Sequence, residues 1–242
     1  FDAMVLGGIQ RFPSHKLPRG ITEMDFRTGS HAMLDFASLP LTLRKMTVSA
    51  TRPHSTSDPE DHMDLASLPP NLTYFYVSME AEMNADSNLS HLPHTLTSLT
   101  LPKIPRVWFI TAHLPRGLKH FSVPDLYSPS MLQDLPPGLT HLATIRLEEA
   151  SHAKFLPPRL EYLRTAGSLD GELLTLLPST LTSLTCELSR NTSMQHINAL
   201  PPTIKSLDLK LYGSTWDNYK LIKSDWTFPP APTLKTLSLR DR

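Results

Sequence analysis

Apolar residues recur in a fixed pattern along almost the whole chain. The unit is L-P-x-x-L-x-x-L-x-L, in which x is mostly polar, and it occurs ten times with conservative variation. Because its last three positions alternate between apolar and polar, two apolar side chains fall on one face of a short strand. Each unit therefore predicts one strand. The fifth position, which we call the anchor, is Leu or Ile throughout: Ile21, Leu43, Leu72, Leu96, Leu118, Leu139, Leu160, Leu181, Ile204 and Leu234.

The spacing of the anchors predicts how the strands assemble. Neighbouring anchors lie 21 to 30 residues apart. A single unit cannot bury its own leucines, whereas stacked units pair their strands in parallel and join their apolar faces into one core. The proline has no N–H to donate, which suits a turn or an extended return segment outside the sheet. An apolar residue three positions before the Leu-Pro pair extends many units: Phe36, Leu65, Leu89, Leu132, Leu174 and Ile197.

These units resemble the leucine-rich repeat family over about residues 17–239. The Leu-Pro start is similar to the FNIP repeats of social amoebae and to the short repeats of bacterial type III effectors. The resemblance implies a right-handed α/β solenoid, with a parallel β-sheet on its concave face and an irregular, proline-rich convex side. We expect one domain of about ten repeats over 1–242. Because the chain opens at Phe1 without an initiator Met, we interpret it as a piece of a longer protein.

Several units depart from the family pattern. The asparagine that the family usually places eight residues after the anchor is replaced in every unit where that position exists, so no asparagine ladder is expected. Thr144, Thr165 and Cys186 occupy inward positions where Leu or Val is usual. After Leu139, Ile145 and Leu147 resume the apolar alternation one residue late, which predicts a bulge.

Composition and charge indicate which class of partner the chain binds. Twenty-three Lys and Arg balance 23 Asp and Glu, so no general attraction to nucleic acid is expected. No apolar stretch approaches the length of a membrane span. The single Cys186 excludes an internal disulfide and favours a reducing, intracellular location, while three N-x-S/T sequons leave secretion open. These properties favour a protein partner, without nucleic acid or membrane insertion.

The side chains that point outward from the strands predict a binding patch. They occupy the positions two and four after each anchor and line the concave face. Most are small and polar, but large hydrogen-bonding side chains gather in the middle of the array: Tyr74, Tyr76, His120, His141, Tyr162 and Arg164. Tyr and Arg are common anchors of protein interfaces. The alternative is that Tyr is present for its β-propensity alone.

Two insertions interrupt the repeat and provide further candidate surfaces. The first, at about 49–64, contains His54 and His62 together with Asp58, Glu60 and Asp61, and we interpret it as a solvated loop rather than a metal site. The second, at about 211–228, contains four Tyr and Trp residues and is expected to cover the end of the array or to bind a partner.

The sequence favours a binding scaffold, such as a substrate-recognition or sensor arm, over an enzyme. No motif that carries a catalytic mechanism is present, and no cofactor or metal is expected. Cys186 is predicted to be a buried structural thiol. The alternative function is a structural subunit packed inside a larger assembly, because the strand Leu237 to Leu239 ends the array without a polar capping unit.

Overall fold

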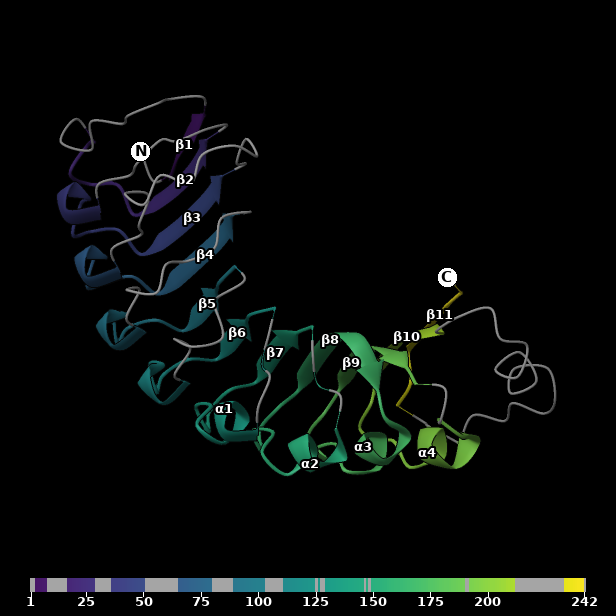
Figure 1. Ribbon diagram of the computed structural model, residues 1–242. Coiled ribbons are helices and arrows are strands. Elements are labelled where there is room, and N and C mark those ends of the chain that lie inside the picture. The colour runs from purple at the N-terminus through teal and green to yellow at the C-terminus, as the bar shows by residue number, and fades with distance from the viewer. Residues whose placement is uncertain are drawn as a thin grey trace, which may run out of the picture. The chain divides into compact units, whose positions relative to one another are not determined.

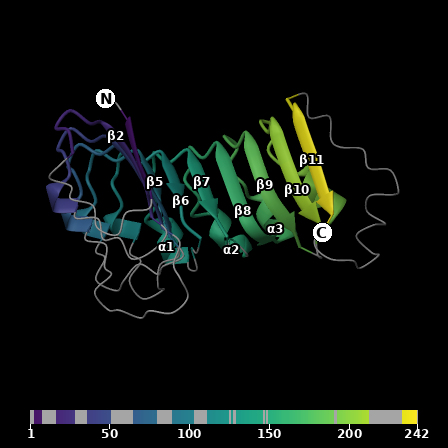
Figure 2. The same cartoon turned by 90° about the horizontal axis from the view of Figure 1, so that it is seen from above.

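The computed structural model describes residues 3–7, 17–28, 36–50, 65–79, 89–102, 111–124, 126, 129–145, 147, 149–189, 192–211 and 233–241. The chain forms two compact units, which we call the N-terminal unit (1–124) and the C-terminal unit (125–242). In each unit the strands pair in parallel and in chain order (Figure 1, Figure 2). Each unit is therefore an open parallel sheet, as the repeat predicts.

The N-terminal unit contains one strand more than the motif predicts. Its strands are β1 (Ala3–Gly7), β2 (Glu23–Thr28), β3 (Lys45–Ala50), β4 (Tyr74–Met79), β5 (Ser98–Thr100) and β6 (His120–Ser122). Short 3-10 turns lie in the return segments: η2 (Phe36–Ser38), η3 (Leu65–Ser67), η4 (Leu89–His91) and η5 (Thr111–His113). The additional strand β1 pairs Met4 with Met24 and Leu6 with Phe26. No Leu-Pro pair precedes it in the sequence, so the repeat motif does not predict it.

The C-terminal unit supplies the remaining strands and replaces the 3-10 turns by short α-helices. Its strands are β7 (His141–Thr144), β8 (Tyr162–Leu169), β9 (Ser183–Leu188), β10 (Ser206–Leu211) and β11 (Thr236–Asp241). Its helices are α1 (Pro129–Gln133), α2 (Ala150–Ala153), α3 (Gly171–Thr175) and α4 (Met194–Asn198). The helices follow one another along one face of the sheet (Figure 1). In the described part of the chain, no helix lies on the other face.

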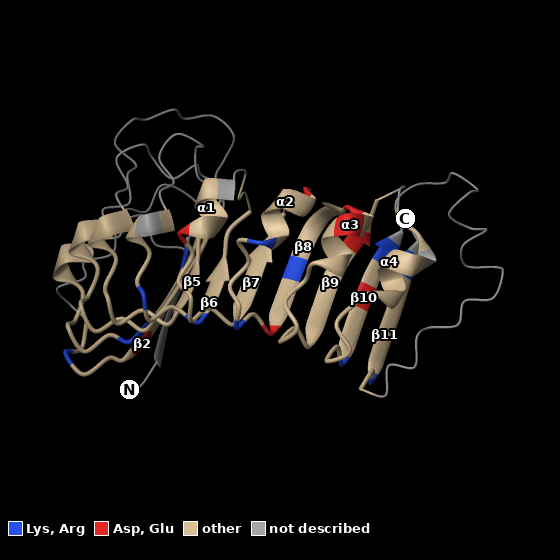
Figure 3. Cartoon of the chain, turned by 90° about the horizontal axis from the view of Figure 1, so that it is seen from below, with Lys and Arg blue, Asp and Glu red and all other residues tan. Residues whose placement is uncertain are grey.

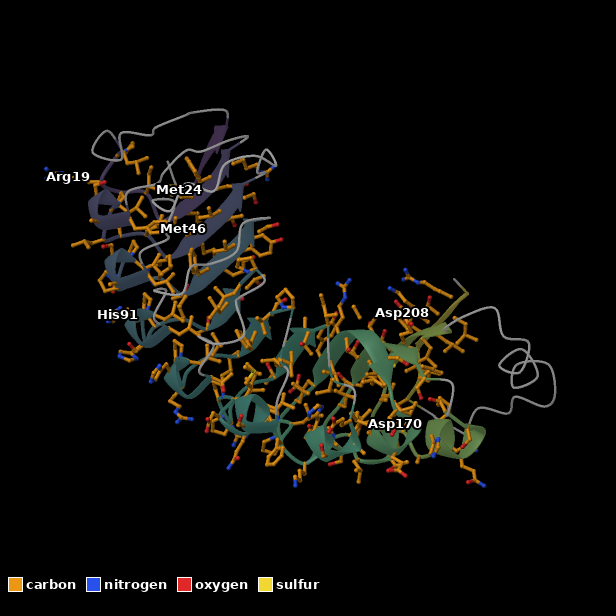
Figure 4. The ribbon with its side chains drawn as sticks, viewed as in Figure 1. Arg19, Met24, Met46, His91, Asp170 and Asp208 are labelled. Carbon is orange, nitrogen blue, oxygen red and sulfur yellow. The ribbon has the colours of Figure 1, made fainter. Side chains whose placement is uncertain are left out.

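The core lies between each sheet and its return segments. Nine of the ten anchors are at most 4% exposed, and only Leu234 is half-buried. The apolar residues three before the Leu-Pro pairs are also buried, with exposures of 6% or less. Met24 and Met46 lie side by side in register on the inner side of the sheet (Figure 4). Burying one leucine side chain in this core stabilises the fold by about 1.5–3 kcal/mol relative to leaving it exposed.

The Pro-x-x-Leu segment forms the turn that leads into each strand. In nine units the N–H of the anchor donates to the carbonyl of the proline three residues before it, as from Leu72 to Pro69 at 3.1 Å. Proline fits this first turn position because its own N–H is not needed there. The next two N–H groups then donate to one carbonyl of the preceding repeat, as Thr97 and Ser98 do to Thr73.

A row of threonines, which the sequence analysis did not single out, joins neighbouring repeats beside these turns. The residue just before the anchor is often Thr, and its hydroxyl lies within hydrogen-bonding distance of two carbonyl oxygens of the preceding repeat. For Thr95 these are Leu72 at 2.7 Å and Pro70 at 2.8 Å. The five threonines of this kind, which we call the bridging threonines, are Thr42, Thr95, Thr180, Thr203 and Thr233. They connect repeats at the start of the strands. The asparagines that this chain lacks would lie elsewhere in the repeat, eight residues after the anchor.

The bulge predicted in the unit of Leu139 is not found, because Leu142 and Thr144 are buried in regular alternation and β7 pairs with β8 without a register shift. Leu147 is buried as expected, but Ile145 is 43% exposed, so the prediction that Ile145 points inward is wrong. The pairing of β8 with β9 shifts between Arg164 and Ser168. The buried hydroxyl of Thr165 donates to the carbonyl of Ile145 and accepts the N–H of Gly167. Thr165 therefore satisfies backbone groups that the irregular β7–β8 segment leaves without ladder partners.

Both insertions lie largely outside the described residues. Beyond the second one, Leu237 and Leu239 on β11 are 41% and 39% exposed, whereas their register partners Leu207 and Leu209 on β10 are buried. None of the helices in the described segments is long and apolar enough to cross a membrane.

Candidate functional site

The six residues of the predicted patch all lie on the outward face of the sheets, but they divide between the two units. Tyr74, Tyr76 and His120 belong to the N-terminal unit, and His141, Tyr162 and Arg164 belong to the C-terminal unit. His120 and Arg164 are exposed and the other four are half-buried. Each half is a candidate surface by itself.

In the N-terminal unit the tyrosines and the histidine are separated by β5, whose outward residues, Ser98 and Thr100, are small. Tyr74 and Tyr76 are on β4, and the register carries Tyr74 through Ser98 on β5 to His120 on β6. On the other side of Tyr74 lies Lys45, which pairs with Glu23 at 2.7 Å. This half offers two aromatic rings beside an ion pair that is already formed.

In the C-terminal unit the aromatic side chains are in contact. The rings of His141 and Tyr162 stack with their centroids 5.5 Å apart and their planes 20° apart. The strands place them together, because His141 on β7 and Tyr162 on β8 are register partners. The Thr140 hydroxyl lies 2.9 Å from Nδ1 of His141 and helps to hold the ring. Such offset stacking fixes a flat apolar surface with polar edges.

Arg164 lies two residues beyond Tyr162 on the same strand and the same face. Its register partners are Ala143 and Thr185, so no large side chain stands on the neighbouring strands at its level. In the described segments Arg164 has no ion pair or side-chain hydrogen bond, whereas Lys45, Arg27 and Arg240 each pair with a carboxylate. Its guanidinium is thus a free cation beside an aromatic stack.

Two aspartates add a feature that sequence reasoning did not select. Asp25 on β2 and Asp208 on β10 each use Oδ2 to accept an arginine, Arg27 at 2.6 Å and Arg240 at 2.9 Å. In both, Oδ1 is buried and has no hydrogen-bond partner in the described part of the chain. The sequence places both four residues after an anchor and hence on the outward face, but it does not show the orientation of the carboxylates.

The acidic, His and Cys side chains are the remaining candidates for a metal site or a nucleophile. In the described residues no group of three or more His, Cys, Asp or Glu side chains could hold a metal ion. Cys186 is 1% exposed, and burial, with smaller effects from Asp208 and Glu187, raises the pKa of its thiol. It therefore stays protonated at neutral pH and is a structural thiol, as predicted.

No protein-family model matches the chain, and no curated protein does either. Among solved structures, it is similar to the leucine-rich repeat-containing protein LegL7 of Legionella pneumophila (15% identity, TM-score 0.48, covering 99% of this chain and 91% of that one). It is also similar to the internalin InlF of Listeria monocytogenes (14% identity, TM-score 0.47, covering 93% and 76%). The repeat, the parallel register and the buried anchors give the chain the fold of a leucine-rich repeat solenoid.

Proposed function

We propose that this chain is a protein-binding scaffold that recognises its partner through the outward face of its sheets. The observation that carries the proposal is the stacked pair His141 and Tyr162 beside the unpaired Arg164. Rigid aromatic side chains bury a large area at a small entropic cost, and an exposed guanidinium forms charge-assisted hydrogen bonds. Tyr74, Tyr76 and His120 supply a second, weaker surface in the N-terminal unit.

The experiment compares partner capture by surface variants of the full chain. One variant carries Tyr162→Ser and Arg164→Gln, a second carries Tyr74→Ser and Tyr76→Ser, and a control carries Arg19→Ala and His91→Ala. The two control residues are exposed and lie on turn segments away from the sheet face (Figure 4). Proteins captured from lysate are identified by mass spectrometry, purified and titrated against each variant.

The expected result is a partner whose affinity falls at least tenfold, about 1.4 kcal/mol, with the Tyr162/Arg164 variant and is unchanged in the control. A smaller loss is expected for the Tyr74/Tyr76 variant. A partner that binds all four proteins equally would overturn the sheet-face proposal and direct attention to the two insertions.

More specifically, we propose that the chain is a substrate-recognition or sensor arm in an intracellular compartment. The similarity of the Leu-Pro start of its repeats to FNIP and effector repeats supports this role.

The second candidate is a structural subunit of a larger assembly. Exposed Leu237 and Leu239 favour it, because leucines at inward positions are normally covered. Sedimentation of the isolated chain tests it: a stable monomer at micromolar concentration contradicts an obligate assembly partner.

A further inference from the structure

The positive charges of the N-terminal unit gather where the chain enters its strands. We define an entry segment as the four residues from two before an anchor to one after it. The entry segments of this unit are 19–22, 41–44, 70–73, 94–97 and 116–119. Because parallel strands begin at the same edge of a sheet, these segments follow one another along that edge. They hold four of the six Lys and Arg residues in the described part of the unit: Arg19, Arg44, Arg116 and Lys119.

The acidic residues in the described part of this unit do not neutralise these charges. There are two of them, and neither lies in an entry segment. Glu23 pairs with Lys45 at 2.7 Å, and Asp25 pairs with Arg27 at 2.6 Å. Figure 3 shows basic positions on the turns that lead into the strands. The entry segments therefore form a basic row, although the chain as a whole is neutral.

The cations of this row project from a fixed backbone. The carbonyl of Arg19 accepts the hydroxyl of Thr42 at 2.8 Å, and the carbonyl of Arg44 accepts the N–H of Thr73 at 2.8 Å. Arg19, Arg44 and Arg116 are exposed and have no ion pair within the described segments, and Arg19 points away from the sheet (Figure 4). Four strand spacings of about 4.8 Å separate β2 from β6, so the row is about 20 Å long.

An exposed leucine stands inside this basic row. Leu41 is 67% exposed, more than any other large apolar side chain in the described residues, and it occupies the turn position that Arg19 has in the preceding repeat. Asn71 fixes this turn, because its side-chain amide donates to the carbonyl of Leu41 at 3.0 Å. One exposed leucine is ordinary on a protein surface, but this one is flanked by Arg19 and Arg44. A leucine between cations suits a surface that is anionic outside and apolar beneath.

We propose that the entry segments of the N-terminal unit bind the surface of a membrane that contains anionic lipids. Arg19, Arg44, Arg116 and Lys119 bind the phosphate and carboxylate groups of the lipid headgroups, and Leu41 enters the interface beside them. The chain adsorbs at the surface and does not span the bilayer. This inference goes beyond the proposed function, because the entry segments lie at the edge of the sheet and the proposed protein-binding residues lie on its outward face.

Two other polyanions fit this row less well. Proteins that bind single-stranded nucleic acid combine cations with stacking aromatic rings, and the entry segments of this unit contain no Phe, Tyr or Trp. An acidic protein segment would have to place an apolar side chain at one defined point to cover Leu41. A bilayer offers its apolar layer beneath every headgroup.

The C-terminal unit has a weaker form of the row and provides an internal comparison. Its entry segments contain Arg159, Lys205 and Lys235, but Glu161 stands among them. No large exposed apolar side chain corresponds to Leu41 there, since the matching described positions hold Pro or Ser. We therefore expect the N-terminal row to bind the membrane surface more strongly.

Cosedimentation of the full chain with lipid vesicles tests the inference. The vesicles contain phosphatidylcholine alone or with about 30% phosphatidylserine, and partitioning is measured at about 0.1 M and about 0.5 M salt. Circular dichroism checks that each variant is folded. The variants of the N-terminal row are Arg19→Gln with Arg44→Gln, and Leu41→Ser.

Two further variants remove the same amount of charge elsewhere. The control is Lys154→Gln with Lys210→Gln, which takes two cations from outside the entry segments. The comparison between the units is Lys205→Gln with Lys235→Gln, which takes two cations from the C-terminal row.

Wild type is expected to bind the anionic vesicles and not the neutral ones, and to bind less at the higher salt concentration. Arg19→Gln with Arg44→Gln weakens partitioning about 25-fold, because each cation near an anionic surface contributes about fivefold, or about 1 kcal/mol. Leu41→Ser weakens it at both salt concentrations, since the lost contact is apolar. The control stays close to wild type, and the C-terminal variant loses less than the N-terminal one.

Four results overturn the inference. Equal losses in the N-terminal variant and the control would show that net charge alone is responsible. An equal or larger loss in the C-terminal variant would place the surface on the other unit. Equal binding to neutral vesicles would exclude the headgroup charge. A wild-type chain that ignores anionic vesicles but binds poly-glutamate or a labelled single strand through Arg19 and Arg44 would point to another polyanion. The sheet-face proposal stands or falls separately, by capture of a protein partner.

Discussion

The hydroxyl of Thr95 lies 2.7 Å from the carbonyl oxygen of Leu72, the anchor of the preceding repeat. The same contact joins Thr180 to Leu160 and Thr203 to Leu181. Each hydroxyl reaches across the turn that precedes a strand, where backbone carbonyls have no ladder partner. The bridging threonines therefore add side-chain links between consecutive repeats to the backbone hydrogen bonds at the start of the strands.

Removing one such bridge should lower the stability of the fold. Thr95→Val keeps the shape of the side chain and removes the hydrogen bond, so we expect a loss of about 1 kcal/mol in the free energy of unfolding. Chemical denaturation measures it. The control is Thr100→Val, because Thr100 lies on the outward face of β5 and its hydroxyl has no hydrogen bond in the described residues. Equal effects of the two substitutions would show that the bridge contributes nothing.

The fold could be predicted from the sequence because the same apolar positions recur in ten units, so each unit supports the assignment of the others. Leu72 and Leu160 are anchors by pattern, and both are fully buried. The bridging threonines were present in the same pattern, just before the anchor, but a polar residue at a turn gives no sign of its partner. Ile145 was misassigned because Thr165 in the next repeat supports an irregular backbone that the apolar pattern cannot show.

The glycine at the start of α3 should not tolerate a side chain. A Cβ on Gly171 would lie 2.6 Å from Cε1 of His196, and that ring is held because its Nδ1 accepts the N–H of Ser193 at 3.0 Å. We expect Gly171→Ala to cost about 1–3 kcal/mol, since the ring must move and lose its donor. The melting temperature in circular dichroism reports this.

Two further variants separate this clash from a general effect of alanine. Gly20→Ala has no atom within 4 Å of the new Cβ and should leave the melting temperature unchanged or slightly higher. His196→Ala in the Gly171→Ala background should recover part of the loss, because the ring that opposes the Cβ is gone. Additive losses in the double variant would contradict a direct contact.

The candidate site was predictable only in part. The alternation of strand residues places Tyr162 and Arg164 outward, and the structure agrees. That His141 stacks on Tyr162 depends on the register between two strands, and that Arg164 lacks an acid depends on its neighbours being Ala143 and Thr185. Those relations join residues from different repeats, so they follow from the register rather than from any single unit.

The buried thiol should make the stability of the fold depend on alkaline pH. Burial raises the pKa of Cys186 above its unfolded value, so the unfolded chain loses this proton first as pH rises. The stabilising contribution is complete below the unfolded thiol pKa of about 8.5 and declines above it, by about 1.4 kcal/mol per pH unit. Denaturation at pH 7, 8, 9 and 10 in wild type and Cys186→Ala measures the difference in slope.

Alkylation provides the independent check of this prediction. Iodoacetamide at pH 8 should leave Cys186 unmodified in the folded chain and modify it completely in denaturant, because only a thiolate exposed to solvent reacts. The alanine variant is expected to be less stable at pH 7, because it leaves a small cavity, but to lose less stability between pH 8 and 10. Parallel pH profiles for the two proteins, together with rapid alkylation of the native chain, would show that the thiol is not held in the core.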